Sequence, residues 1–476
     1  MRASRLPAAI VVAGIAILGS ATAPSTTAGA AAAQPEFTGT AVAHYPGGVL
    51  PPEDQIIPVP AVELFGTAFT GTGEPTIGVG RDGTLYSDDL TKTVVSTDHG
   101  KTWRDISPSN NVPASLDPYL YLDPVTNRLF KSDLIGTCQH LAFSDDEGTS
   151  WTRLPAACNL SDHQTIAAGP PATSQTVGYQ NVVYDCSQSA GYNGYSAASI
   201  CDKSIDGGRT WVPTGTPAYH DPSPYGFGPG SGDSGVPGHC NGDIGHIFVG
   251  SDGALYVPRG WCGQPWLAVS HDEGATWTRT QVASNGMNTT VTGGFGLVAP
   301  GSGQSDHEAA VVADTKGNLF YMWMGLDRLP WLAVSRDHGA TWSSPLMIGA
   351  PGVNEAWGPA LGIDPDGRVS VAYMGTSGSP GAPWTGDYAN VAWFGYVAVI
   401  PKPLDTRPLI FSAATSSASR PFVKGTCGPD RCDPVLDFID VQSATDGSAW
   451  AAFVDAPRSK RLVVAHLAPP PPPAAP

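Results

Sequence analysis

Ionisable side chains recur along this chain at intervals that suggest one group of them per structural repeat. Aspartate, glutamate and histidine are the residue types that act as general acids and bases, and carboxylate together with imidazole also binds divalent metals. Because such chemistry needs several groups at one point, we expect side chains from distant parts of the sequence to converge. The set consists of Glu74, Asp117, Asp162, His163, Asp243, His246, Asp306, His307, Glu308, Glu355, Asp433 and Asp437.

Four of these carboxyl groups are the candidates for catalysis. Asp306, Glu308, Asp243 and Glu355 belong to the most regular repeats, and a pair of carboxyls could serve as general acid and as base or nucleophile on a glycosidic bond. A separation of about 5 Å would imply retention of configuration, and about 6.5–9.5 Å would imply inversion. The alternative is a solvated polar rim around a wet channel.

The histidines allow a second chemistry. His163, His246 and His307, with Asp162, could hold a transition metal in a central channel, because imidazole and carboxylate suit zinc and its neighbours. Each histidine could instead be a hydrogen-bonded channel residue. We therefore expect no obligatory cofactor and keep a divalent metal ion as the alternative.

Basic and aromatic residues are the candidates for substrate binding. Arg259 and Arg328 lie at matching places in adjacent repeats, in loops expected between second and third strands. A guanidinium pair could clamp a substrate carboxylate, although surface salt bridges are the simpler interpretation. Further substrate contacts are assigned to Asp117 and to aromatic side chains that could stack on sugar rings, namely Tyr119, Trp261 and Trp357.

A repeated octapeptide, S-x-D-x-G-x-[TS]-W, indicates the strands and turns that position these groups. Its five copies end at Trp103, Trp151, Trp211, Trp277 and Trp342, far enough apart for four strands and a loop each. In such a turn the aspartate can accept hydrogen bonds from turn amides, and the glycine supplies a positive φ. A residue repeated once per unit is structural rather than catalytic, and this applies to Asp98, Asp146, Asp206, Asp272 and Asp337.

A strand–turn–strand segment precedes each octapeptide, and counting these segments predicts an all-β propeller. Seven blades are expected, and six remain possible, with residues 41–70 supplying a closing strand. The octapeptide joins the third strand of a blade to the fourth. The inner strands therefore begin at the opposite rim, where we expect the ionisable set to lie over the channel.

Composition limits the partners and the compartment. Residues 1–33 read as a signal peptide with an Ala-rich leader, residues 34–468 as one propeller domain and residues 469–476 as a Pro-rich tail. A net charge of −17 disfavours nucleic acid and anionic membranes. We expect a secreted, extracellular monomer without a membrane span, whose ligand is a glycan or another small molecule or polymer.

The eight cysteines lie in near-neighbour pairs. In an exported chain an even count favours disulfides across loops, and no pair has the C-x2-C spacing of zinc ribbons. The expected bridges are Cys138–Cys158, Cys186–Cys201, Cys240–Cys262 and Cys427–Cys432.

The octapeptide resembles the Asp-box, or BNR repeat, of the sialidase superfamily. The segments LDPYLYLDP (116–124), DHQTIAAGP (162–170), DCSQ (185–188) and CNGDIGH (240–246) resemble bacterial secreted repeat proteins described as sialidase family. The [FY]-R-I-P motif that carries the first substrate-binding arginine of sialidases has no counterpart here. The resemblance thus implies a propeller without implying an arginine triad.

These features favour a secreted, carbohydrate-active, sialidase-like propeller that acts as a glycoside hydrolase on extracellular glycans. One alternative is a non-catalytic propeller that binds glycan or protein at the cell surface. Another is a metal-dependent polysaccharide lyase or hydrolase, suggested by the histidines.

Overall fold

The computed structural model describes most of the chain between residues 55 and 470. The described ranges are 55–59, 62–70, 73–108, 114–158, 161–189, 196–221, 244–261, 264–284, 292–293, 296–297, 309–325, 327–378, 390–415, 419–425, 432, 435–458 and 460–470. Outside them lie the signal sequence, residues 471–476 of the Pro-rich tail, and the candidates Asp243, Asp306, His307, Glu308 and Asp433.

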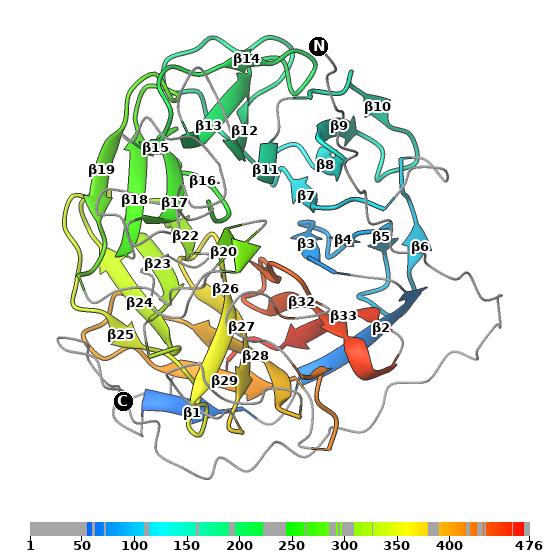
Figure 1. Ribbon diagram of the computed structural model, residues 1–476, viewed down its shortest axis with the longest axis vertical. Helices are drawn as coiled ribbons and strands as arrows, with labels where there is room; N and C mark the ends of the chain where they lie inside the picture. Colours follow the sequence, from blue (N-terminus) through cyan, green and yellow to red (C-terminus); the bar gives the residue numbers. More distant parts are fainter. Residues whose placement is uncertain are drawn as a thin grey trace, which may run out of the picture.

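Seven sheets, antiparallel apart from one parallel edge pair in the sixth, are arranged as the blades of a propeller, as Figure 1 shows. The first two are β3 (Thr76–Val79), β4 (Leu85–Asp88), β5 (Thr93–Ser96), β6 (Arg104–Asp105) and β7 (Pro118–Leu122), β8 (Leu129–Ile135), β9 (Cys138–Ser144), β10 (Thr152–Arg153). The third is β11 (Ser161–Gly169), β12 (Val182–Ser189), β13 (Ser196–Ser204) and β14 (Val212–Pro213), with β15 (Tyr219–Asp221) also on β13. The fourth is β16 (Phe248–Val249), β17 (Leu255–Trp261), β18 (Gln264–Ser270) and β19 (Thr278–Gln281).

The remaining blades follow the same order from the axis outward. The fifth is β22 (Ala309–Ala313), β23 (Leu319–Met324), β24 (Pro330–Ser335) and β25 (Leu346–Met347). The sixth is β26 (Glu355–Ile363), β27 (Val369–Thr376), β28 (Ala392–Ile400) and β29 (Ile410–Ala414), extended by β1 (Ile56–Pro58) and β30 (Val423–Lys424). The seventh is β31 (Asp440–Ser443), β32 (Ala449–Asp455), β33 (Arg461–Leu467) and β2 (Val62–Thr70). A hairpin of β20 (Thr292–Gly293) and β21 (Gly296–Leu297) and the 3-10 turn η2 (Ala456–Arg458) complete the described elements.

The ring is closed by a strand from the N-terminal part of the chain. Strand β2 pairs antiparallel with β33, so the blue and red ends of the described chain lie side by side (Figure 1). Each inner strand contacts the next around the axis, and β31 contacts β3. Closure removes the exposed inner edges that an open array of sheets would have. The predicted seven-bladed propeller and its closing strand are confirmed.

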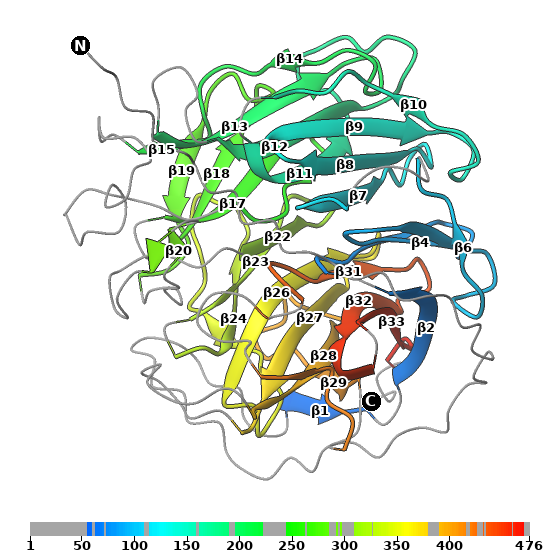
Figure 2. The same ribbon diagram turned by 45° about the vertical axis from the view of Figure 1, so that its right-hand side comes forward.

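Strands buried on both faces explain the apolar runs in the sequence. Every residue of β23 (LFYMWM) is buried, because the sheet is packed between neighbouring blades (Figure 2).

The tight turns between first and second strands use Asp and Gly. In the first blade, Asp82 accepts the amide of Thr84 at 3.0 Å, and Gly83 has a φ of 84°.

The octapeptide turns have the expected structural role. In the first copy Asp98 accepts the Thr102 amide at 2.8 Å and the Thr102 hydroxyl at 2.7 Å, and the Gly100 amide donates to Ser96 Oγ at 2.8 Å. The glycines have φ between 75° and 91°, at Gly100, Gly148, Gly208, Gly274 and Gly339. The residue before each glycine also has a positive φ, which the sequence pattern did not reveal.

Two predicted disulfides are present among the described residues. Cys138 bonds to Cys158 and Cys186 to Cys201, and the second pair joins residues directly opposite on β12 and β13. Cys432 is disulfide-bonded as well, but its predicted partner Cys427, like the Cys240–Cys262 pair, lies outside the described residues. In the part of the chain that the structure describes, no helix is long and apolar enough to cross a membrane.

Candidate functional site

The starts of the inner strands gather ionisable groups on the rim opposite the Asp-box turns. Asp117 immediately precedes β7, His163 lies in β11, and His246 lies shortly before β16. Asp437 and Asp440 lie at the start of β31. We call these five residues the axial cluster, because their strands are the innermost of their blades and surround the propeller axis (Figure 1).

A β-bulge places two consecutive side chains of β11 at this site. The pairing of β11 with β12 shifts between Asp162 and Thr165, and His163 has a φ of 50°. The irregularity turns the His163 amide toward Asp117, whose Oδ2 it reaches at 2.7 Å. Gln164 Nε2 donates to the Asp117 carbonyl oxygen. Hydrogen bonds from His163 and Gln164 thus hold Asp117, the residue before β7, against β11.

Asp117 is a buried carboxyl group with an elevated pKa. Its side chain is 4% exposed, and burial raises its pKa to about 7. The positive charge of His163 and the hydrogen bond from its main-chain amide lower the pKa of Asp117, whereas the carboxylates of Asp162 and Asp437 raise it further. Asp117 Oδ1 is buried without a hydrogen-bond partner. A carboxyl group in this state can hold a proton near neutral pH.

His163 links Asp117 to the last blade. Its Nε2 lies 3.6 Å from Asp437 Oδ2, and its ring meets Phe438 edge-on at 6.3 Å. Both His163 and Asp437 are 6% exposed. The pair therefore forms a largely desolvated histidine–carboxylate contact beside the Asp117 carboxyl group.

His246 and Asp440 form a second contact of the same type. His246 Nδ1 lies 3.8 Å from Asp440 Oδ1, and the ring packs edge-on against Tyr119 at 5.0 Å and Phe438 at 5.1 Å. Burial among these rings, with His163 nearby, lowers the pKa of His246 to about 3. Burial raises the pKa of Asp440 to about 7, against the Ile77 amide that donates to it at 3.0 Å. His246 is therefore neutral at physiological pH.

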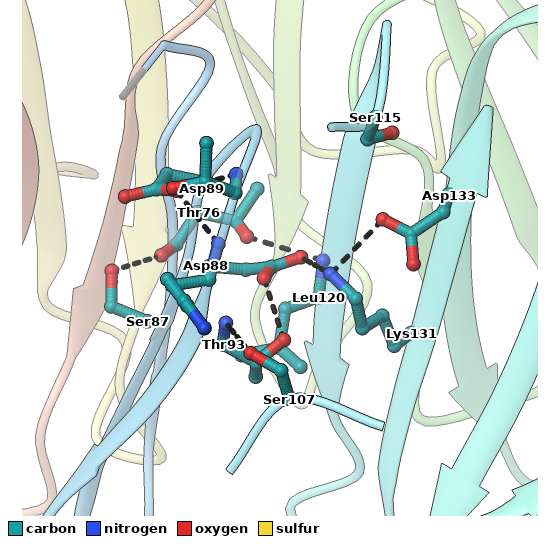
Figure 3. A network of polar contacts seen from close by, with 12 residues as sticks. Thr76, Ser87, Asp88, Asp89, Thr93, Ser107, Ser115, Leu120, Lys131 and Asp133 are labelled. Atoms are coloured by element: carbon teal, nitrogen blue, oxygen red, sulfur yellow. Dashed lines mark hydrogen bonds and ion pairs between the residues drawn. The ribbon is translucent and has the colours of Figure 1, made fainter. Parts of the chain in front are cut away.

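A buried lysine lies between two aspartates, between the first two blades (Figure 3). Lys131 Nζ is 2.5 Å from Asp88 Oδ2 and 3.1 Å from Asp133 Oδ1. Burial raises the pKa of Asp88 to about 7, and the two carboxylates raise that of Lys131. Ser115 connects this network to the cluster, since its Oγ accepts the amides of Asp117 and Leu134. Lys131 is therefore neutralised locally.

The expected arginine clamp is not formed as predicted. The position expected for Arg259 is wrong: it lies within β17, opposite Trp266, and not in a loop. It is fully buried, donates to Ser199 Oγ at 2.9 Å and lies over the Tyr219 ring. Arg328 does lie between β23 and β24, but it forms an ion pair with Glu355 in which both side chains are 1% exposed. Glu355 is thus the partner of an arginine rather than a member of the axial cluster.

The aromatic candidates are mostly packing residues. Trp357 is 3% exposed and belongs to the hydrophobic cluster that contains Trp393 and Ile439, so the stacking role predicted for it is corrected. Trp261 is half-buried, with its ring edge-on to Trp266 and Tyr219. Tyr119 is 6% exposed and contacts His246. Only the Tyr119 ring among these three belongs to the axial cluster's surroundings.

The metal hypothesis is tested only in part. Of its four residues, His163 is buried and His246 partly exposed within the axial cluster, Asp162 is exposed, and His307 lies outside the described residues. Within the described ranges, no group of three or more His, Cys, Asp or Glu side chains is arranged to hold a metal ion. The catalytic candidates Asp243, Asp306 and Glu308 lie outside those ranges.

Three members of the site were missed in the sequence. Asp440 is absent from the predicted set because the last inner strand begins there and not at Asp433, and Gln164 is a neutral residue that follows the predicted His163. Lys131 has a visible signal in the sequence, since a lysine, a serine and an aspartate interrupt an otherwise apolar strand, LFKSDLI. Charged residues within such strands are expected to be paired.

Comparisons with known proteins identify the repeat. Residues 94–105, around the first octapeptide, match the BNR/Asp-box repeat family. No curated protein matches the chain. Among solved structures, a protein of unknown function from Dyadobacter fermentans DSM 18053 is 12% identical with a TM-score of 0.46, covering 87% of this chain and 100% of that one. An alpha-L-arabinanase from Penicillium chrysogenum is 15% identical (TM-score 0.40; 68% and 91% covered), and the Hadza microbial sialidase Hz136 is 17% identical (0.39; 64% and 63%).

Proposed function

We propose that this Asp-box propeller is an extracellular carbohydrate-active protein that cleaves glycosidic bonds by acid–base chemistry at the axial cluster. The observation that carries the proposal is the carboxyl group of Asp117, buried beside two other carboxylates with a pKa raised to about 7. Glycoside hydrolysis requires one carboxyl group that is protonated at working pH and a second that is ionised. Disulfide bonds in the fold agree with an extracellular location.

The roles follow from the contacts. Asp117 donates the proton to the leaving oxygen of the glycosidic bond, because burial favours its neutral form. Asp437, held against His163, supplies the carboxylate that acts as base or nucleophile. The exposed side chain of Asp162 and the partly exposed ring of His246 mark the open side of the cluster, through which a sugar would enter.

A second candidate function is glycan binding without cleavage. It is favoured by the low exposure of Asp117, His163 and Asp437, at 4%, 6% and 6%. A sugar would then contact the outer residues of the cluster only. The two functions differ in whether Asp117 is needed for bond cleavage or only for affinity.

The test is a panel of plant, bacterial and animal glycans incubated with the full-length protein, with release of reducing ends as the measurement. We expect cleavage of at least one glycan, and Asp117→Asn should lower kcat/KM by about 10²–10⁴-fold. Asp405→Asn, an exposed carboxylate on the Asp-box rim, is the matched control. Retention on a glycan column without cleavage would favour the binding function. Loss of activity with EDTA, restored by zinc, would favour the metal-dependent alternative.

A further inference from the structure

The charge at the axial cluster bears on what the site binds. Apart from His246 and from His163, which contacts Asp437, every ionisable side chain of the cluster and its edge is a carboxyl group: Asp117, Asp437, Asp440 and the adjoining Asp162. His246, with its pKa lowered to about 3, contributes no positive charge at neutral pH. A site lined by one sign of charge with low-dielectric walls focuses its field on ligands of the opposite sign.

In the part of the chain that the structure describes, three buried cations, Lys131, Arg328 and Arg259, already contact other groups. Lys131 is bound by two carboxylates, and Arg328 is bound by Glu355. Arg259 is fully buried against Ser199 and Tyr219. A carboxylate or sulfate on a ligand would therefore meet carboxylates at this rim, at a cost in free energy that these cations do not offset.

The unpartnered polar atoms of the cluster are acceptors. Asp117 Oδ1 and Gln164 Oε1 are buried without hydrogen-bond partners, on side chains that are 4% and 2% exposed. Gln164 is part of the site because its Nε2 donates to the Asp117 carbonyl. His246 Nε2 is also buried and unpartnered, and it is an acceptor in the tautomer that carries its proton on Nδ1 toward Asp440. Buried acceptors without partners are rare and indicate a missing donor.

We propose that the axial cluster is specific for a cationic sugar, that is, one bearing a primary ammonium group. An ammonium group supplies three hydrogen-bond donors and no acceptor, and its positive charge is opposite to that of a carboxylate. A neutral hydroxyl group would donate one hydrogen bond but bring no positive charge. An anionic group would bring only further hydrogen-bond acceptors and a negative charge. The inference rests on the proposed function in placing a glycan at this site, and it names the class of that glycan.

Binding of such a sugar displaces protons from the cluster. Asp117 and Asp440 share an environment in which burial favours their neutral forms. An ammonium group beside them favours the ionised forms, so protons leave as the ligand binds. The titratable groups facing Asp117 are His163, Asp162 and Asp437, and those facing Asp440 include His246. Proton release is therefore a signature of binding at this cluster that attraction by the protein's overall charge would not produce.

The experiment compares three β-linked hexasaccharides of similar length by isothermal titration calorimetry at pH 5.5, where the amines of glucosamine carry their protons: a glucosamine hexamer, its N-acetylated form and a uronate hexamer. We expect the amine form to bind at least tenfold more tightly than the N-acetylated form, with no binding of the uronate. Titrations in two buffers of different ionisation enthalpy should show net proton release. Asp117→Asn should lower the affinity for the amine form at least tenfold, and Asp405→Asn should leave it unchanged. If Asp117→Asn fails to fold, Gln164→Ala tests the same acceptors.

The outcomes separate this inference from the proposed function. Amine-specific binding without cleavage supports the inference and removes the hydrolase. Cleavage of a neutral glycan with no preference for the amine form keeps the hydrolase and overturns the inference. Equal binding of all hexamers, binding of none, or amine binding that is indifferent to both Asp117→Asn and Gln164→Ala would also overturn it.

Discussion

The guanidinium group of Arg328 and the carboxylate of Glu355 form a salt bridge between the fifth and sixth blades in which neither side chain is more than 1% exposed. The Ala356 amide also donates to the Arg328 carbonyl oxygen at 2.7 Å, so side chain and main chain join the same two blades. Arg328, which was predicted to bind a substrate carboxylate, and Glu355, which was predicted to be catalytic, thus form an ion pair with each other.

Breaking this pair from one side should be strongly destabilising. Arg328→Met leaves the Glu355 carboxylate buried without its partner, at a cost of roughly 3–5 kcal/mol in the free energy of unfolding. Chemical denaturation followed by tryptophan fluorescence measures it. The double variant Arg328→Met/Glu355→Gln removes the stranded charge and should recover part of the loss. If the double variant were as unstable as the sum of the two single variants, the ion pair would not be the cause.

Folding stability should fall as pH rises from about 4 to about 7. Asp88, Asp117, Asp185 and Asp440 have folded pKa values raised to about 7, against about 3.9 in the unfolded chain. In this window the folded protein keeps protons that the unfolded chain has released. The lowered pKa values of His246 and His466 act in the opposite sense below about 6.5, but they are two groups against four.

A single substitution isolates this effect. Asp185→Asn keeps an acceptor for Gln139, which donates to Asp185 Oδ2 at 2.7 Å, but removes the buried ionisation. The variant should therefore be more stable than wild type at pH 8 and similar to it at pH 4. The slope should become shallower by up to about 1.4 kcal/mol per pH unit. Asp98→Asn is the control, since the pKa of Asp98 is lowered to about 2 by its turn and lies below the window.

The Asp-box glycines should differ from other left-handed glycines in what they tolerate. At Gly208 the φ is 88°, and an added Cβ would lie 2.8 Å from the Phe130 ring. At Gly136 the φ is 66°, and a Cβ would meet nothing within 4 Å. Gly136→Ala therefore carries backbone strain alone, of about 1 kcal/mol, and Gly208→Ala should cost roughly 1–2 kcal/mol more. Similar unfolding midpoints for the two variants would show that the contact with Phe130 relaxes freely.

If Asp117 is the general acid, activity should decline as pH rises through about 7, because its proton is then lost. Asp162→Asn removes a neighbouring negative charge that raises the pKa of Asp117. The alkaline limb of the kcat/KM profile should move to lower pH, by a few tenths of a unit to about one unit. A limb that stays in place or moves upward would assign it to another group.

The sequence predicted most of the architecture because its signals are local. Five octapeptides ending in tryptophan determine the turns between third and fourth strands. The hydrogen bonds that form such a turn are local, since Asp98 accepts one from the amide of Thr102, only four residues away. Cysteines such as Cys186 and Cys201 are close in sequence and become direct neighbours on paired strands. The strand directions then place the inner strand starts, with His163 and His246, on the other rim.

The partners of those residues were decided only by the tertiary structure. Asp117 and His163 are 46 residues apart, and His163 and Asp437 are farther apart still, so no local pattern records their contact. Likewise, burial is a property of the packed blades: it encloses the ion pair of Arg328 and Glu355 and raises the pKa of Asp117. Residue type and spacing determined which groups approach the axis. The bulge in β11 and the closure of the ring determined which of them meet, because both depend on contacts among all seven blades.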